Sequence, residues 1–299
     1  MNKVLKLGFV LIFCITFLTP NITWAVSPTL ITFPEKIQRG DPVMITVVGL
    51  TKISEVKEIT FDGIHVPVFL YSPEGKQASN GAGKKVTAFI GVDLRKKPGN
   101  YNLKVKLTNG QTLEKVITVL EREKVEEPLG IPEKLGGNTT ASQNNLIAVL
   151  ATENSTLNNL YTGKKAFWTE SFHFPLSQIF VTDPYGYSRE TGAYTIPHKG
   201  TDFRASEGTP VMAMNRGVVR IARTGISYGK TIVVDHGLGL QTFYLHLSKI
   251  KVNVGELVLP GQIIGLSGQT GYTDAPHLHL SIRLNGVSID PMKFMEFFK

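Results

Sequence analysis

Polar and apolar residues alternate without a break in the segment 277–284, HLHLSIRL. Successive side chains of a β-strand point to opposite faces, so this alternation predicts a strand with one polar and one apolar face. We therefore expect a β-strand that places His277, His279, Ser281 and Arg283 together on its polar face.

The segment 240–247, LQTFYLHL, has a similar pattern and predicts a second strand. Its two expected faces are Thr242, Tyr244 and His246 on one side, and Phe243, Leu245 and Leu247 on the other. If both strands belong to one sheet, His246, His277 and His279 can converge above it. A sheet can build a metal site from sparse residues in this way.

Strand patterns extend over most of the chain. Between residues 28 and 120, segments rich in Val, Ile and Thr recur between turn signals: TLITF, VMITVVG, KEITFDG, VPVFLY, VTAFIGV, YNLKVKLT and LEKVITVL. This spacing predicts a small β-sandwich of the immunoglobulin-like kind, although the Cys and Trp of antibody domains are absent from it. Asp62-Gly63 and Asn109-Gly110 predict type I′ hairpin turns, in which both central residues have positive φ.

The organisation along the chain predicts two domains, because 299 residues exceed the roughly 100–200 residues of one domain. We expect the β-sandwich over 26–122 and a linker over 123–170, where a charged stretch passes into Pro, Gly, Ser and Asn. Apolar residues at near-helical spacing from Leu146 to Tyr161 predict one helix in this linker. A second, mostly β domain is expected over 171–299.

Residues 1–25 have the features of a secretory signal peptide: two lysines, an apolar run over 7–18, and a polar end at Ala25. The apolar run is shorter than the roughly 20 residues of a membrane span, and an uncleaved anchor is the alternative. Cleavage would start the mature chain at Val26 and remove Cys14, the only cysteine, which excludes disulfides and thiolate metal ligands. We expect an exported protein, periplasmic or extracellular at the cell wall, with no membrane span after cleavage.

Lys and Arg number 32 against 24 Asp and Glu, a formal net charge of +8. A basic surface can attract nucleic acid, anionic lipid or an acidic wall polymer, because a long-range field does not distinguish polyanions. Export argues against nucleic acid, so no nucleic-acid partner is expected. The composition does not indicate an oligomeric state.

His198 and Asp202, in HKGTDFRA, stand four residues apart and can point the same way from an extended chain, with Gly200 allowing a tight approach. Imidazole and carboxylate groups suit zinc, and a catalytic zinc ion keeps three protein ligands and one open position. Together with the histidines of the two strands, this pattern indicates three metal ligands and two further histidines. His65, His173 and His236 lack such neighbours and are left out of the site.

Four segments follow one another along the second domain: PHKGTDFRASEGTPVMAMNRGVV, GKTIVVDHGLGLQTFYLHLSKI, VGELVLPGQIIGLSGQTG and APHLHLSIRLNG. Together they resemble the lysostaphin-type (LytM-like) zinc endopeptidases over about residues 172–291. The resemblance implies a mostly antiparallel β-sheet of the duplicated hybrid motif type that forms the floor of a groove. It implies one Zn²⁺ per chain bound by His198, Asp202 and His279, with His246 and His277 as catalytic residues. It also implies hydrolysis of peptide cross-links in bacterial peptidoglycan.

The roles of the two catalytic histidines stay open: either can accept a proton from a zinc-bound water while the other donates to the developing oxyanion. Three alternatives also stay open. The chain could be a non-catalytic scaffold that activates other wall hydrolases, a zinc enzyme with three histidine ligands, or a module that binds wall polymers. The absence of a phosphate loop, a nucleophile elbow and a catalytic cysteine argues against nucleotide-dependent and acyl-enzyme chemistry.

Overall fold

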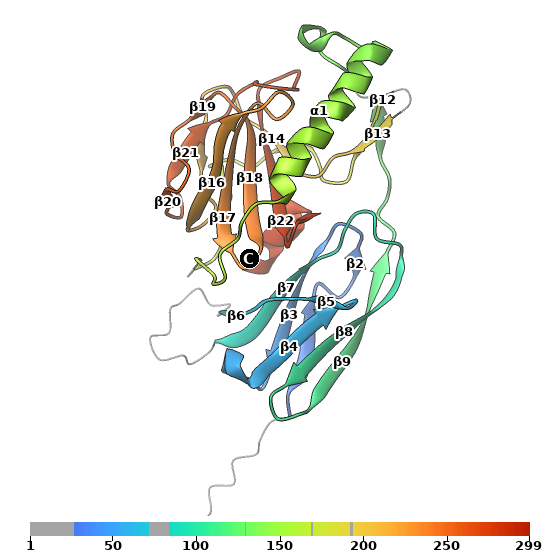
Figure 1. Cartoon of the computed structure of the whole chain (residues 1–299), viewed down its shortest axis with the longest axis vertical. Helices are drawn as coiled ribbons and strands as arrows, with labels where there is room; N and C mark the ends of the chain where they lie inside the picture. Colours follow the sequence, from blue (N-terminus) through green and yellow to red (C-terminus); the bar gives the residue numbers. More distant parts are fainter. Residues whose placement is uncertain (1–26, 72–83, 129, 169, 192–193) are drawn as a thin grey trace, which may run out of the picture.

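The computed structural model describes residues 27–71, 84–128, 130–168, 170–191 and 194–299. The predicted signal peptide falls outside these residues. The chain is mostly β, with two N-terminal sheets followed by a larger C-terminal sheet that has a long helix alongside it (Figure 1). No helix in the described part is long and apolar enough to cross a membrane.

The N-terminal region contains two sheets packed around one core. The first has the order β1 (Thr29–Phe33), β3 (Pro42–Val48), β7 (Lys85–Gly91) and β6 (Val68–Tyr71). The second has the order β2 (Ile37–Gln38), β9 (Thr112–Leu120), β8 (Gly99–Leu107), β4 (Val56–Phe61) and β5 (Ile64–His65), and a short 3-10 helix, η1 (Ile53–Glu55), precedes β4. Val43, Ile45 and Val47 of β3 share one buried apolar cluster with Leu103 and Val105 of β8, so the two sheets pack face to face.

The two predicted hairpin turns differ in the structure. Asp62 and Gly63 both have positive φ, 50° and 78°, so this type I′ prediction is confirmed. At Asn109-Gly110 only Gly110 has a positive φ, 90°, so the type I′ prediction there is wrong. The Asn109 side chain accepts a hydrogen bond from the backbone N–H of Gln111 at 2.9 Å, and this local contact stabilises a wider turn.

The C-terminal region is built on an eight-stranded sheet whose printed strand pairs are all antiparallel. Its order is β11 (Val181–Asp183), β14 (Thr201–Arg204), β22 (His277–Leu284), β18 (Leu240–Leu247), β17 (Lys230–Gly237), β16 (Gly217–Thr224) and β20 (Leu257–Val258), with β23 (Val287–Ile289) beside β22. A smaller sheet contains β15 (Pro210–Met212), β21 (Ile263–Leu266) and β19 (Lys249–Ile250). The chain ends in α2 (Pro291–Met295) and η3 (Glu296–Phe298).

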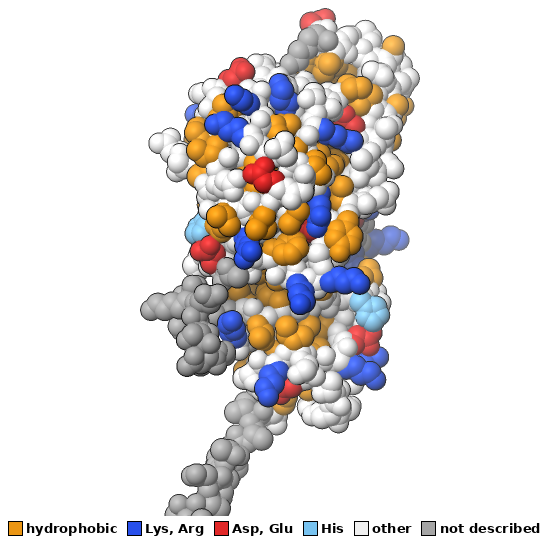
Figure 2. All heavy atoms as spheres, turned by 60° about the vertical axis from the view of Figure 1, so that its left-hand side comes forward, with side chains coloured by type: hydrophobic (Ala, Val, Ile, Leu, Met, Phe, Trp, Pro, Cys, Tyr) orange, Lys and Arg blue, Asp and Glu red, His pale blue; other side chains and the backbone are white. Residues whose placement is uncertain are grey.

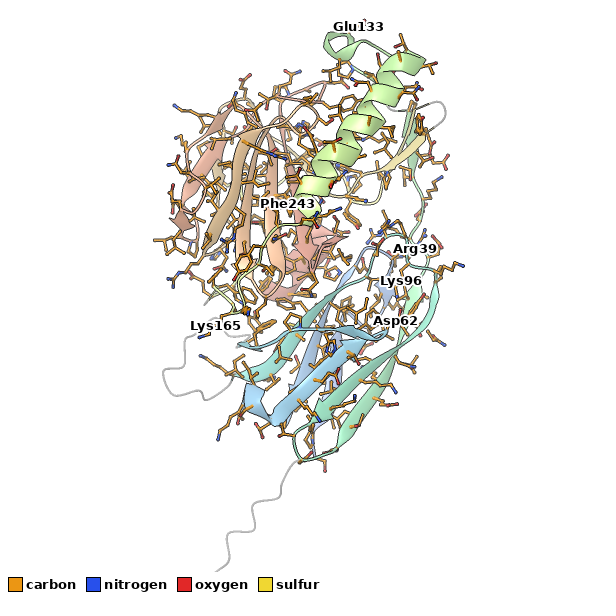
Figure 3. The ribbon with its side chains drawn as sticks, viewed as in Figure 1. Arg39, Asp62, Lys96, Glu133, Lys165 and Phe243 are labelled. Carbon is orange, nitrogen blue, oxygen red and sulfur yellow. The ribbon has the colours of Figure 1, made fainter. Side chains whose placement is uncertain are left out.

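The segment between the two regions is docked on the C-terminal region. Its short strand β10 (Glu126–Pro128) pairs in parallel with β12 (Ser188–Thr191), which forms a hairpin with β13 (Tyr194–Pro197). After η2 (Glu133–Leu135), α1 (Thr140–Asn158) lies in the segment whose apolar spacing predicts a helix. Leu157 of α1 packs in a cluster with Leu245 and with Phe243, which Figure 3 labels beside the C-terminal end of α1.

An aromatic cluster joins the N-terminal and C-terminal regions. Phe89 of β7 stacks on Trp168 with ring centroids 6.3 Å apart and on Phe297 with centroids 5.4 Å apart. Arg122 also bridges the regions, because its guanidinium donates to Asp41 and, at 3.2 Å, to Asp290. The two regions therefore pack against each other through buried side chains and are not connected by the linker alone.

Phe89→Ala is expected to lower the free energy of unfolding by about 3–5 kcal/mol, because it leaves a cavity among packed aromatic rings. Denaturant titration of the purified protein measures the change. Phe180→Ala is the matched control, because Phe180 is 53% exposed and its substitution should lower the free energy of unfolding far less. Equal small losses in both variants would contradict a shared core.

Candidate metal centre

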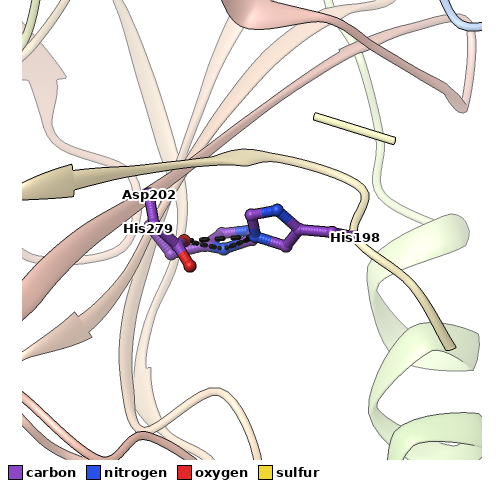
Figure 4. A group of neighbouring side chains, drawn as sticks. All are labelled: His198, Asp202 and His279. Atoms are coloured by element: carbon purple, nitrogen blue, oxygen red, sulfur yellow. Dashed lines mark hydrogen bonds and ion pairs between the residues drawn. The ribbon is translucent and has the colours of Figure 1, made fainter. Parts of the chain in front are cut away.

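Three polar side chains converge on the C-terminal sheet: His198, Asp202 and His279 (Figure 4). Their candidate ligand atoms all lie within 4.8 Å of one another. Asp202 Oδ1 is 3.2 Å from His198 Nε2 and 2.7 Å from His279 Nδ1, and the two ring nitrogens are 3.0 Å apart. Asp202 is buried and the other two are largely shielded from solvent.

Strand register accounts for two members of this group. Asp202 on β14 is the direct antiparallel partner of His279 on β22. His198 reaches them from outside the strand, because β14 begins only at Thr201 and the chain bends at Gly200. His198 and Asp202 do lie together, as the sequence predicts. The prediction that an extended chain brings them together is wrong.

Hydrogen bonds on the far side of each ring determine which nitrogen faces the group. His198 Nδ1 donates to the carbonyl oxygen of Pro184 at 3.0 Å, so its Nε2 carries the lone pair. Ser281 Oγ donates to the carbonyl of Lys199 at 2.9 Å and so must accept from His279 Nε2, also at 2.9 Å. His279 Nδ1 therefore carries the other lone pair.

This donor set fits a divalent cation such as zinc. Two nitrogen lone pairs and one carboxylate oxygen face one another with no proton between them in these tautomers, and a cation would relieve their repulsion. Burial raises the pKa of Asp202, but the positive charge that His198 and His279 carry when protonated outweighs it and lowers that pKa well below its usual range. The carboxylate is therefore ionised at neutral pH.

Gly200 allows the close approach that the sequence predicts. A Cβ atom at this position would lie 2.3 Å from His279 Nε2 and 2.6 Å from the carbonyl oxygen of Leu280. Either the ring or the strand backbone would have to move.

Gly200→Ala is therefore expected to weaken zinc binding by about 10–100-fold, the usual effect of disturbing a residue that orients a ligand. Competition with a zinc chelator measures the affinity. Gly130→Ala is the control, because its added Cβ would meet no atom within 4 Å. Wild-type affinity in Gly200→Ala would show that His279 does not need its present position to bind metal.

His246 and His277 lie beside this group. His277 Nε2 is 3.7 Å from Asp202 Oδ1, and the rings of His246 and His277 have centroids 4.9 Å apart. Each donates from Nδ1 to a backbone carbonyl at 2.9 Å, Thr270 for His246 and Ala275 for His277, so each Nε2 is free to accept a proton. Burial, with His277 and His279 nearby, lowers the pKa of His246 to about 3.

The face predicted for His246 is wrong. The alternation places it with Thr242 and Tyr244, yet Tyr244 is buried in the main core, whereas Phe243 and Leu245 line the cavity together with His246. His246 has a positive φ of 59°, which breaks the strand alternation at that residue. Along β22 the alternation holds: His277 and His279 line the cavity and the intervening leucines lie in the core.

The histidines left out of the predicted site lie elsewhere. His236 is buried, its Nδ1 donates to the carbonyl of Arg216 at 2.9 Å, and burial lowers its pKa to about 4. His65 Nδ1 lies 3.1 Å from Glu58 Oε1 in the N-terminal region. The backbone N–H of His173 bonds to the carbonyl of Met214. None of them belongs to the metal group found among the described residues.

A cavity of about 680 Å³ connects the four histidines and Asp202 with residues from distant parts of the chain. Leu150 and Asn154 of α1, Ile196 of β13 and the loop 272–276 line its sides. Arg189 and Arg283 also line it. The sequence patterns did not identify α1 or Arg189 as part of the cavity lining, because neither segment has residue types or a spacing that indicates a functional site.

Comparison with known proteins gives three consistent findings. The sequence model described as Peptidase family M23 matches residues 196–291. The chain is 46% identical over 97 residues to the peptidoglycan DD-endopeptidase ShyA of Vibrio cholerae, covering 32% of this chain and 23% of that protein. It is 43% identical over 123 residues to the glycyl-glycine endopeptidase ALE-1 of Staphylococcus capitis, covering 38% of this chain and 33% of that protein.

A crystal structure of a Pseudomonas aeruginosa protein assigned to peptidase M23 matches more of the chain. It has a TM-score of 0.62 at 25% identity and covers 88% of this chain and 96% of that one. Its match therefore includes the N-terminal β region. The curated relatives, in contrast, are matched over about a third of their length or less.

Proposed function

Since the chain belongs to peptidase family M23, we propose that it is a zinc-dependent endopeptidase that hydrolyses peptide cross-links of bacterial peptidoglycan. The observation that carries this proposal is the convergence of His198, Asp202 and His279, with two further histidines in the same cavity. Relatives named as peptidoglycan DD-endopeptidases support the substrate class.

His198, Asp202 and His279 would hold the zinc ion through Nε2, Oδ1 and Nδ1, the atoms that their other hydrogen bonds leave free. When bound, zinc polarises a carbonyl and lowers the pKa of its bound water toward about 7. The remaining position of a three-ligand site is open for water or substrate.

His246 and His277 supply proton transfer in this proposal. Each keeps its Nδ1–H on a backbone carbonyl, so each Nε2 can accept a proton from the attacking water. A nitrogen that has accepted the proton becomes a donor, able to bond the developing oxyanion or to protonate the leaving amine. The hydrogen bonds permit either histidine in either role, while burial lowers the pKa of His246 to about 3 and makes its neutral ring a weak base.

We further infer that residues 26–122 form an immunoglobulin-like sandwich, 123–170 a linker that carries α1, and 171–299 a peptidase domain of the duplicated hybrid motif type. The two N-terminal sheets around one core support the first, and the pairing of β16 with β20 and of β15 with β21 supports the last. Residues 1–25 would direct export to the periplasm or the cell exterior. N-terminal sequencing of the exported protein tests a start at Val26.

The zinc-loaded protein, residues 26–299, incubated with defined peptidoglycans tests the proposed activity. Mass spectrometry is expected to find stem cross-links opened, with chelator-treated protein as the inactive control. Absence of cleavage on every wall type, with zinc bound, would instead support a scaffold that activates other hydrolases.

A wall-binding module is the less favoured function. Figure 2 shows Lys and Arg side chains distributed over both regions on that face of the molecule, without one continuous basic patch. Such a distribution provides no defined track for an acidic polymer on that face. The cavity with its histidines is the more specific feature.

A further inference from the structure

The two oxygens of Asp202 have different partners. Oδ1 lies against His198 and His279, whereas Oδ2 lies 3.3 Å from Nη2 of Arg189. The same guanidinium nitrogen also donates to Asp183 Oδ2. Arg189 therefore contacts the proposed ligand carboxylate on the side away from the two histidines.

Strand pairing explains why a positively charged side chain is needed beside Asp202. Asp183 at the end of β11 is the antiparallel partner of Asp202 on β14. Like charges on directly opposite residues destabilise a strand pair, and Arg189 lies between these two carboxylates. It compensates both charges and fixes the orientation of Asp202 in the same contact.

The segment between the two regions helps to hold the strand that carries Arg189. Arg189 is the second residue of β12, which pairs on one edge with β13 and on the other with β10. In register, Arg189 lies opposite Glu127 of β10. The Ser188 N–H adds a bond of 2.9 Å to the carbonyl of Val125. Strand β12 is thus held on both edges.

We propose that Arg189 is a positioning residue that holds Asp202 through Oδ2 and so presents Oδ1 alone to the metal. The proposal rests on the proposed zinc function. Carboxylates that bind metals are usually fixed by such outer hydrogen bonds, and losing one typically costs about 10–100-fold in metal affinity or activity. A guanidinium suits the task because it stays charged and because its Nη2 alone carries two N–H donors, one for each carboxylate.

Zinc affinity without substrate tests this role, since a residue that only bound substrate would leave that affinity unchanged. Chelator competition on residues 26–299 is expected to show zinc binding about 10–100-fold weaker in Arg189→Ala. The loss should be smaller in Arg189→Lys, which keeps the charge but not the planar geometry of the donors. Arg204→Ala is the matched control: Arg204 lines the same cavity but stacks on Phe180 at 4.0 Å, and its variant should bind zinc as the wild type does.

Wild-type zinc affinity in a folded Arg189→Ala, or a change confined to KM, would overturn the positioning role and leave the proposed function standing. If Arg189→Ala fails to fold by circular dichroism, Arg189→Lys decides: weaker zinc binding supports the role and unchanged binding overturns it. A wild-type chain that binds no zinc would overturn the proposed function and this inference together.

Discussion

His279→Ala is expected to lose bound zinc and peptidoglycan hydrolysis together. It removes Nδ1, one of three converging ligand atoms, and leaves only His198 Nε2 and Asp202 Oδ1 to hold the ion. Metal analysis of the purified variant after dialysis, and cleavage of the same peptidoglycan, measure the two losses.

The control for His279→Ala is His65→Ala. His65 is a histidine with a largely exposed side chain in the N-terminal region, so its loss should change neither zinc content nor cleavage. Circular dichroism establishes that both variants are folded. A folded His279→Ala with its full zinc content would remove His279 from the ligand set.

His277→Ala is expected to keep most of its zinc and to lose turnover by about 10²-fold or more, the usual range for a positioned acid–base group. Its Nε2 lies 3.7 Å from Asp202 Oδ1 but does not belong to the three-residue metal group. His246→Ala should behave in the same way, because its Nε2 is likewise free. Zinc content and the rate of peptidoglycan cleavage, measured on the same samples, separate binding from turnover.

The pair of variants on β22 is informative because one residue separates the two histidines on the same strand face. A zinc-free His277→Ala beside a zinc-bound His279→Ala would reverse the proposed roles. Loss of zinc in both variants, with Asp202→Asn retaining it, would instead favour a site with histidine ligands alone.

Local pattern determined much of the fold. The alternation in 277–284 requires only that neighbouring side chains point to opposite faces, and the structure has His277 and His279 on one face with apolar residues on the other. The Val- and Ile-rich segments became strands for the same reason. Asp62-Gly63 formed its predicted turn because both residues tolerate positive φ.

Predictions from the local sequence pattern were wrong where contacts with other strands or loops determine the backbone conformation. The alternation misplaced His246, whose backbone turns to a positive φ at a register shift between β17 and β18. The meeting of His198 with Asp202 came from a bend before β14 and not from an extended chain. Neither departure is encoded in the spacing of polar and apolar residues.

The sequence by itself determined that the chain is mostly β, which residues are candidate metal ligands, and that two histidines share a strand face. Only the tertiary structure decided which ring nitrogens face the candidate metal site. Pro184 accepts from Nδ1 of His198, and Ser281 accepts from Nε2 of His279 because its own hydroxyl proton goes to the carbonyl of Lys199, distant in sequence. It also decided that α1 lines the cavity and that Arg189 holds Asp202 from strand β12. These arrangements depend on contacts between residues distant in sequence, which periodicity along one segment does not specify.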